Sequence, residues 1–236
     1  MNAEQVDPSE LVQPRGGAFY QRFKRVTDLL IAAVALVVTL PLIVAAAVAL
    51  RLESKGPIIY RQKRVGLDGR DFEIYKLRTM VDGAEHLGAG LAVDENDARI
   101  TRVGALLRRT SVDELPNLVN VVRGEMSLVG PRPTVRRQVD AYTPRQLCRL
   151  SVKPGIAGWA QLIGRASLPW SERIELDLWY LANRSTKLDF SVFVNNLFNK
   201  AYRVYAFDGS LYWGDTLGVY AKPRTWGVSM KYNFGK

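Results

Sequence analysis

Asp113 and Glu114 are adjacent carboxylates that lie between arginine-bearing segments of the stretch 108–133, RRTSVDELPNLVNVVRGEMSLVGPRP. Carboxylates can hold Mg²⁺ or act as nucleophiles, and arginines bind phosphate through planar, bidentate contacts. Both chemistries in one segment indicate a site that handles an activated phosphate. The competing interpretation is structural: Ser111 would cap a helix and Glu114 would complete a capping box.

Basic side chains around this pair are the candidates for phosphate binding. Arg132 lies in the rigid Pro-Arg-Pro sequence 131–133, which suits precise aiming of its side chain. Arg108 shortly precedes the carboxylates, while Lys76 and Arg78 alternate in YKLRTM and would share one face of a strand. The alternative for any one of them is a solvated face or a surface beside anionic lipid.

The segment 152–161, VKPGIAGWAQ, is expected to be a loop whose glycines permit close approach of its backbone to a ligand. It adds Lys153, Trp159 and Gln161 as candidate substrate contacts. Trp159 could stack on a base or a sugar, but packing in the core is the favoured interpretation.

Composition narrows the classes of partner and site. The 236 residues carry a formal net charge of +10, which favours anionic partners such as anionic lipid, nucleic acid or phosphorylated small molecules. The chain lacks a basic stripe interleaved with aromatics in its first 190 residues, so nucleic acid is not expected. With Cys148 and His86 as its single cysteine and histidine, a zinc site is nearly excluded, and oxygen ligands are expected for any metal.

An uncharged segment, residues 29–50, has about the length of one bilayer-spanning helix. Basic residues flank it on both sides: Arg22, Lys24, Arg25, Arg51 and Lys55. Positive charge marks the cytoplasmic side, so two basic flanks conflict with a straight span. Pro41 lies in the middle and should kink the helix. We therefore favour a re-entrant helix over an ordinary spanning one, the alternative.

The remaining patterns predict an α/β fold that is mostly helical with a small sheet. We expect a disordered tail over 1–18, two strands around a turn at 67–70, a mobile loop over 82–99, and helices over 101–109, 114–123, 135–150 with a break near Pro144, and 170–182. In residues 191–236 the period switches to two, with Trp226 to Phe234 alternating, which predicts a β-strand tail of foreign, hairpin-like architecture.

Residues from about 22 to 190 resemble the bacterial sugar transferases, the monotopic phosphoglycosyl transferases. The matching segments are KRVTDLLIAAVALVVTLPLIVAAAVALRLESKGPIIYRQKRVGLDGRDFEIYKLRTM, RITRVGALLRRTSVDELPNLVNVVRGEMSLVGPRP and YTPRQLCRLSVKPGIAGWAQLIGRASLPWSERIELDLWYLANRS. Several long motifs in the right order make this resemblance specific.

The resemblance implies a membrane helix over 19–55, kinked at Pro41, and a cytoplasmic catalytic domain over 56–190 at the bacterial inner membrane. It implies an aspartate nucleophile, Asp113, and a metal-binding Glu114, which with Asp113 would hold Mg²⁺. The implied phosphate-binding residues are Lys76 or Arg78, Arg108 and Arg132.

The implied reaction is ping-pong transfer of a sugar-1-phosphate from a UDP-sugar to polyprenyl (undecaprenyl) phosphate. Asp113 would carry the phosphosugar covalently, UMP would leave, and the product would initiate exopolysaccharide, O-antigen or another lipid-linked glycan. The sugar and the oligomeric state are left open.

The chain departs from the family pattern in two places. Leu40 stands where many members have a serine before the kink proline, here Pro41. Members continue into a further helix after LANRSTKLDF, which we do not expect here, because residues 191–236 resemble the last strands of TonB-dependent outer-membrane receptors. The alternatives are therefore a fragment of such a receptor, or an inactive fusion of the two.

Overall fold

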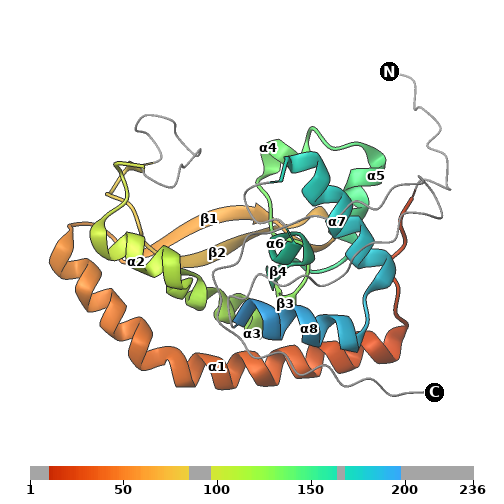
Figure 1. Cartoon of the computed structure of the whole chain (residues 1–236), viewed down its shortest axis with the longest axis horizontal. Helices are drawn as coiled ribbons and strands as arrows, with labels where there is room; N and C mark the ends of the chain where they lie inside the picture. The colour runs from red at the N-terminus through yellow and green to blue at the C-terminus, as the bar shows by residue number, and fades with distance from the viewer. Residues whose placement is uncertain (1–10, 85–96, 164–167, 198–236) are drawn as a thin grey trace, which may run out of the picture.

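A computed structural model describes residues 11–84, 97–163 and 168–197. One long helix, α1 (Ala18–Glu53), underlies a mostly helical domain that carries two small sheets (Figure 1). Among the described residues, α1 is the helix whose length and apolar composition would allow it to cross a membrane.

The helix α1 exposes an apolar surface and contains Pro41. Figure 1 shows that α1 is bent along its length. A proline removes one helical hydrogen bond and crowds the preceding turn, which accounts for a bend. The Thr39 hydroxyl donates to the carbonyl of Ala35 at 2.7 Å. The exposed apolar side chains of the helix are Phe19, Phe23, Val26, Leu29, Leu30, Ile31, Val34, Val37, Val38, Leu40, Leu42, Val44, Val48 and Leu52.

The folded domain holds both ends of α1. Near its start, the Arg25 guanidinium donates to the carbonyls of Val121 at 2.6 Å and Val122 at 2.9 Å. At its end, the Glu53 carboxylate accepts from the backbone N–H of Arg102 at 2.8 Å. The domain therefore lies along one side of the whole helix, as Figure 1 shows.

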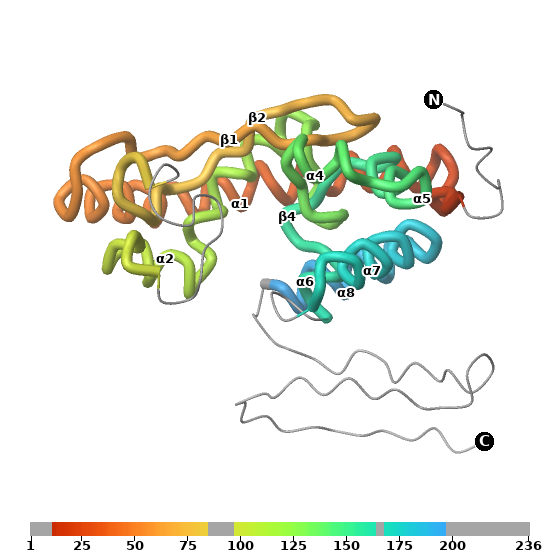
Figure 2. Tube along the Cα trace, turned by 90° about the horizontal axis from the view of Figure 1, so that it is seen from above, coloured from red at the N-terminus to blue at the C-terminus, as the bar shows by residue number. Residues whose placement is uncertain are grey.

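Two short sheets shape the domain. The strands β1 (Ile59–Val65) and β2 (Asp71–Leu77) form the predicted antiparallel pair, joined through the one-turn 3-10 helix η2 (Leu67–Gly69). A parallel pair of β3 (Ser127–Val129) and β4 (Gly155–Ala157) was not predicted. It places β4 inside the expected loop 152–161, which continues into α6 (Trp159–Ile163). Figure 2 shows the β1–β2 hairpin and the helices α6, α7 and α8 on opposite sides of the molecule.

The helical segments predicted over 101–109, 114–123, 135–150 and 170–182 all contain helix, and two of them are divided into shorter helices. The helices in these segments are α2 (Arg102–Thr110), the 3-10 helix η4 (Val112–Asn117), α3 (Leu118–Arg123), α4 (Arg136–Val139), α5 (Pro144–Leu147), the 3-10 helix η5 (Cys148–Ser151) and α7 (Trp170–Asn183). The predicted break near Pro144 separates α4 from α5, and Gly124 ends α3 in the left-handed conformation. The main core cluster packs residues of α1, α3, β3, β4, α7 and α8 together.

Two expectations about the ends of the domain need correction. Residues 11–17 are not a free tail: the Arg15 N–H donates to the carbonyl of Leu181 at 2.9 Å, and Val12 packs against the core cluster. The chain also continues past residue 190 into α8 (Thr186–Leu197), so a β-tail cannot begin at 191. The rest of that tail (198–236), residues 1–10 and most of the expected mobile loop lie outside the described residues.

Candidate active site

The carboxylate pair is positioned by a sharp turn between two helices. After α2, Ser111 adopts the left-handed conformation (φ 57°), and the first turn of η4 follows with Asp113 and Glu114. The Ser111 side chain makes no capping bond, so the capping-box interpretation is wrong. The turn instead brings the carboxylates back toward Arg108, which lies in the last turn of α2.

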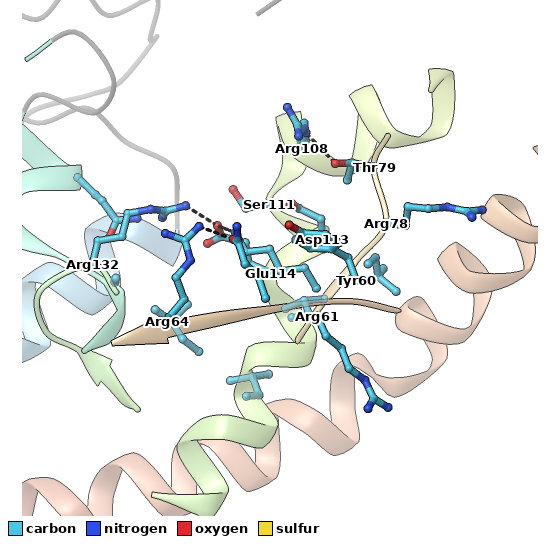
Figure 3. Close-up of a pocket in the computed structure, with 18 of the residues that line it drawn as sticks. Tyr60, Arg61, Arg64, Arg78, Thr79, Arg108, Ser111, Asp113, Glu114 and Arg132 are labelled. Carbon is cyan, nitrogen blue, oxygen red and sulfur yellow. Dashed lines mark hydrogen bonds and ion pairs between the residues drawn. The ribbon is translucent and has the colours of Figure 1, made fainter. Parts of the chain in front are cut away.

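Two basic residues bind one oxygen of Glu114. Lys76 Nζ lies 2.6 Å from Glu114 Oε1. Arg132 Nη2 donates to the same atom at 3.0 Å (Figure 3). Burial would raise the pKa of the Glu114 carboxyl, but the charges of Arg132 and Lys76 outweigh it and hold that pKa at about 2. Glu114 is therefore ionised throughout the physiological range.

Asp113 has the opposite electrostatic environment. Its side chain is buried, and burial together with the neighbouring charge of Glu114 raises the pKa of Asp113 to about 6, against the weaker opposing charges of Lys76 and Arg108. Two adjacent carboxyls with pKa values separated in this way indicate different roles. Near neutral pH, Asp113 is an ionised but poorly solvated carboxylate, which suits a nucleophile.

Both carboxylates line a cavity of about 1610 Å³. Its basic wall includes Arg64, Lys76, Arg108 and Arg132. Figure 3 shows the three arginines coming from different elements around the pair. The cavity reaches the membrane helix, where Ile31, Ala35 and Thr39 of α1 contribute to its lining. It therefore connects the basic wall around the carboxylates with the apolar helix.

The structure separates the roles of Lys76 and Arg78. Lys76 contacts Glu114 of the carboxylate pair, whereas Arg78 follows the end of β2 and is buried. Its guanidinium donates to the carbonyls of Lys55 at 2.6 Å and Ser54 at 3.0 Å, which fastens the end of α1. Arg78 also lines the cavity, but Figure 3 shows its guanidinium directed away from the carboxylates. Arg108 lines the cavity and donates to Thr79 Oγ1 at 2.8 Å.

The candidates in 152–161 have separate positions. Trp159 is buried and stacks on Trp179 with ring centroids 4.9 Å apart, so packing is its role in the fold. Lys153 does not belong to the cavity lining; burial and the nearby charge of Arg25 lower its pKa beside α1. Gln161 lines the cavity, and its role as a substrate contact stays a prediction.

Sequence reasoning missed several charged residues of the cavity, among them Arg64, Arg149 and Asp177. Arg64 faces it from β1, and Arg149 forms an ion pair with Asp177 in its wall. Arg64 belongs to the strongly basic sequence YRQKR, which gives no sign of which side chain turns inward. Arg149 and Asp177 are far apart in the chain, and no local pattern joins them.

The carboxylates fit the ligand set that Mg²⁺ prefers when it binds with a phosphorylated substrate. Such sites use one or two carboxylates together with water and substrate phosphates. The described residues contain no cluster of three or more Asp, Glu, His or Cys side chains, so the protein contribution would come from Asp113 and Glu114. Lys76 and Arg132 both bind Oε1 of Glu114, which leaves its Oε2 for a cation.

A model of the bacterial sugar transferase family matches residues 19–202. The chain is 43% identical over 169 residues to the uncharacterized sugar transferase EpsL of Bacillus subtilis, a match that covers 72% of this chain and 82% of EpsL. It is 44% identical over 176 residues to a UDP-N-acetylgalactosamine-undecaprenyl-phosphate N-acetylgalactosaminephosphotransferase of Aeromonas hydrophila, covering 72% of this chain and 41% of the relative. Identity to the UDP-glucose:undecaprenyl-phosphate glucose-1-phosphate transferase of Escherichia coli is 40% over 179 residues, which are 72% of this chain and 38% of that enzyme.

The matches differ in how much of each relative they span. This chain covers most of EpsL but less than half of the two larger transferases. The family match begins before and ends beyond the predicted limits of about 22 and 190, and it includes all of α8. It also includes η4 with its carboxylate pair and the whole described cavity lining. The chain therefore belongs to the bacterial sugar transferase family.

Proposed function

We propose that this protein transfers a sugar-1-phosphate from a UDP-sugar to undecaprenyl phosphate. The observation that carries the proposal is the carboxylate pair, a buried Asp113 beside a partly buried Glu114, in a basic cavity that extends to the apolar helix α1. Such a cavity can receive a soluble diphosphate and a lipid phosphate at one point. The names of the Aeromonas and Escherichia relatives give this reaction class, with N-acetylgalactosamine in one and glucose in the other.

In the first step, a carboxylate oxygen of Asp113 attacks the β-phosphorus of the UDP-sugar. The bond from that phosphorus to the bridging oxygen breaks, UMP leaves with the bonding electrons, and an aspartyl-phosphosugar forms. Arg132, Lys76 and Arg108, which line the cavity, would bind the phosphate oxygens and offset their charge.

In the second step, a phosphate oxygen of undecaprenyl phosphate attacks the same phosphorus. The bond to Asp113 breaks, and the carboxylate is regenerated. Glu114 keeps Lys76 and Arg132 beside the reacting phosphorus through both steps. Mg²⁺, when bound by Glu114 and Asp113 with the diphosphate, would neutralise charge and help UMP to leave.

The proposal is tested with membranes that contain the full chain. UDP-sugar alone should release UMP in an amount limited by the enzyme, and mass spectrometry should find a phosphosugar on Asp113. Addition of undecaprenyl phosphate should then make UMP release continuous. UMP release that requires both substrates from the start, without any adduct, would contradict the covalent mechanism.

The pH dependence should report the ionisation of Asp113. Only the carboxylate attacks, so kcat/KM for the UDP-sugar is expected to be constant well above pH 6 and to fall about tenfold for each pH unit below it, since the pKa of Asp113 is about 6. Steady-state UMP release between pH 5 and 8.5 measures this profile. A profile that stays flat down to pH 5 would show that burial does not raise the pKa of this carboxyl.

We further propose that α1 is re-entrant and lies at the cytoplasmic face of the bacterial inner membrane, where its basic flanks contact anionic lipid. A 36-residue helix is about 50 Å long, and the domain contacts both of its ends. A straight span would place these ends on opposite sides of about 30 Å of hydrocarbon, which would draw the charged domain into the bilayer.

Cysteine labelling tests this topology. In a Cys148→Ser background, Arg22→Cys and Lys55→Cys mark the two exposed flanks of α1. Both cysteines are expected to resist a membrane-impermeant maleimide added to intact spheroplasts and to react after lysis. Labelling of one flank from outside would show that the helix crosses the membrane.

A further inference from the structure

One part of the cavity wall carries polar atoms that have no partner within the described structure. Asp177 and Arg149 are 2% and 3% exposed and form an ion pair through Asp177 Oδ2. The other carboxylate oxygen, Asp177 Oδ1, and the Arg149 Nε–H have no hydrogen-bond partner among the described residues. The same holds for the Trp170 Nε1–H and for Gln161 Oε1.

These four side chains gather beside the backbone of Arg132. The Arg149 guanidinium carbon lies 5.4 Å from the ring centroid of Trp170, and its Nη2 donates to the Arg132 carbonyl at 3.0 Å. Gln161 Oε1 and the Arg132 backbone nitrogen both lie near Gly158. They are 2.9 and 3.8 Å from the position that a Cβ atom would take at this glycine. Arg132 therefore links this cluster to Glu114, which its guanidinium binds.

A buried polar group without a partner is costly, and four in one cavity wall point to a ligand that supplies the missing bonds. The cluster offers two acceptors, on Asp177 and Gln161, and two donors, on Arg149 and Trp170. A hydroxyl group both donates and accepts, so several hydroxyls satisfy this mixed set. A phosphate does not satisfy this set, because its oxygens only accept hydrogen bonds and cannot donate to Asp177 or Gln161. The charge of Arg149 is also already neutralised by the Asp177 carboxylate.

We propose that the cluster of Arg149, Gln161, Trp170 and Asp177 binds the hydroxyl groups of the sugar ring of the donor, an inference that rests on the proposed function. The sugar is bonded directly to the phosphorus that Asp113 attacks, and the cluster adjoins the backbone of Arg132, whose side chain reaches the catalytic pair. The cluster would then determine which UDP-sugar is used. The uridine, which lies beyond the α-phosphate and leaves with UMP, is bound elsewhere.

Two conservative variants test this assignment without leaving a buried charge unpaired. Gln161→Leu removes one acceptor, and Trp170→Phe removes one donor while an aromatic ring remains. UMP release is measured with UDP-glucose, UDP-galactose and their N-acetylamino counterparts, and UMP is measured as a competitive inhibitor. Gln21→Leu, the same chemical change at an exposed position of α1, is the matched control.

Each variant is expected to lower kcat/KM for the preferred UDP-sugar about tenfold or more. The ratio of kcat/KM for this sugar to that for its 4-epimer should also fall, because hydrogen bonds to substrate hydroxyls discriminate strongly between sugars. The inhibition constant of UMP should stay within twofold of the parent value. Equal weakening of UMP and UDP-sugar would assign the cluster to uridine and overturn the inference, as would unchanged sugar preference. If the parent chain released no UMP from any UDP-sugar, the proposed function itself would fail.

Discussion

Asp113→Asn is expected to lower UMP release by about 10³-fold or more and to abolish the phosphosugar adduct. The amide is a poor nucleophile, and the proposed covalent step has no other route. Single-turnover UMP release and intact-protein mass spectrometry measure the two effects. Asp71→Asn removes a carboxylate from an exposed ion pair with Arg136 and should leave both signals unchanged.

The loss in Asp113→Asn should not come from unfolding. Burial raises the pKa of Asp113 from its ordinary 3.8 to about 6, so between these values the folded state holds a proton that the unfolded state releases. The stability that this group contributes is therefore present at low pH and lost as pH rises through about 6. At about 1.4 kcal/mol per pH unit, the ionised side chain costs the fold about 3 kcal/mol at pH 7.5.

Asparagine carries no charge at any pH, so the variant should have a Tm at pH 7.5 that equals or exceeds the parent value. A large fall in Tm together with lost activity would show that Asp113 supports the fold. Retained UMP release would contradict its role as the nucleophile. A rate that falls while an adduct still forms on another residue would place the covalent step elsewhere.

The sequence could predict the clustering of the carboxylate pair with Arg132 because the residues that indicate it are close together in the chain. Two adjacent carboxylates and an arginine between prolines can be found without any knowledge of the fold, and Asp113, Glu114 and Arg132 do lie together. The distinction between Lys76 and Arg78 was beyond sequence reasoning. Alternation indicates that the two side chains share a face of the strand. However, β2 ends at Leu77, and Arg78 instead contacts the end of α1.

Long-range pairing explains the other omissions. The β1–β2 hairpin was predictable because its turn and its alternating strands are neighbours in sequence. The strands β3 and β4 have three residues each and lie far apart in the chain, so neither produces a periodic signal. The Arg149–Asp177 pair forms for the same kind of reason, through the packing of α7 against η5.

Glu114→Gln is expected to lower kcat about 100-fold, the upper range for removal of a group that supports a metal site. The amide carries no charge, so Lys76 and Arg132 lose the carboxylate that holds them at 2.6 and 3.0 Å. Mg²⁺ would lose one of its two protein ligands. The measurement is steady-state UMP release against MgCl₂ concentration, and the Mg²⁺ needed for half-maximal rate should rise.

The same variant should also shift the pH profile. Burial is the main reason that the pKa of Asp113 is high, and the charge of Glu114 is the second. Removal of that charge should move the acidic limb to lower pH, by less than the whole distance to the ordinary aspartate value. Glu175→Gln, the same change in an exposed ion pair with Arg145, should alter neither the limb nor the Mg²⁺ dependence. If Glu114→Gln lowered kcat but left the acidic limb and the Mg²⁺ dependence unchanged, Glu114 would serve only to position Lys76 and Arg132. Mg²⁺ would then bind without it.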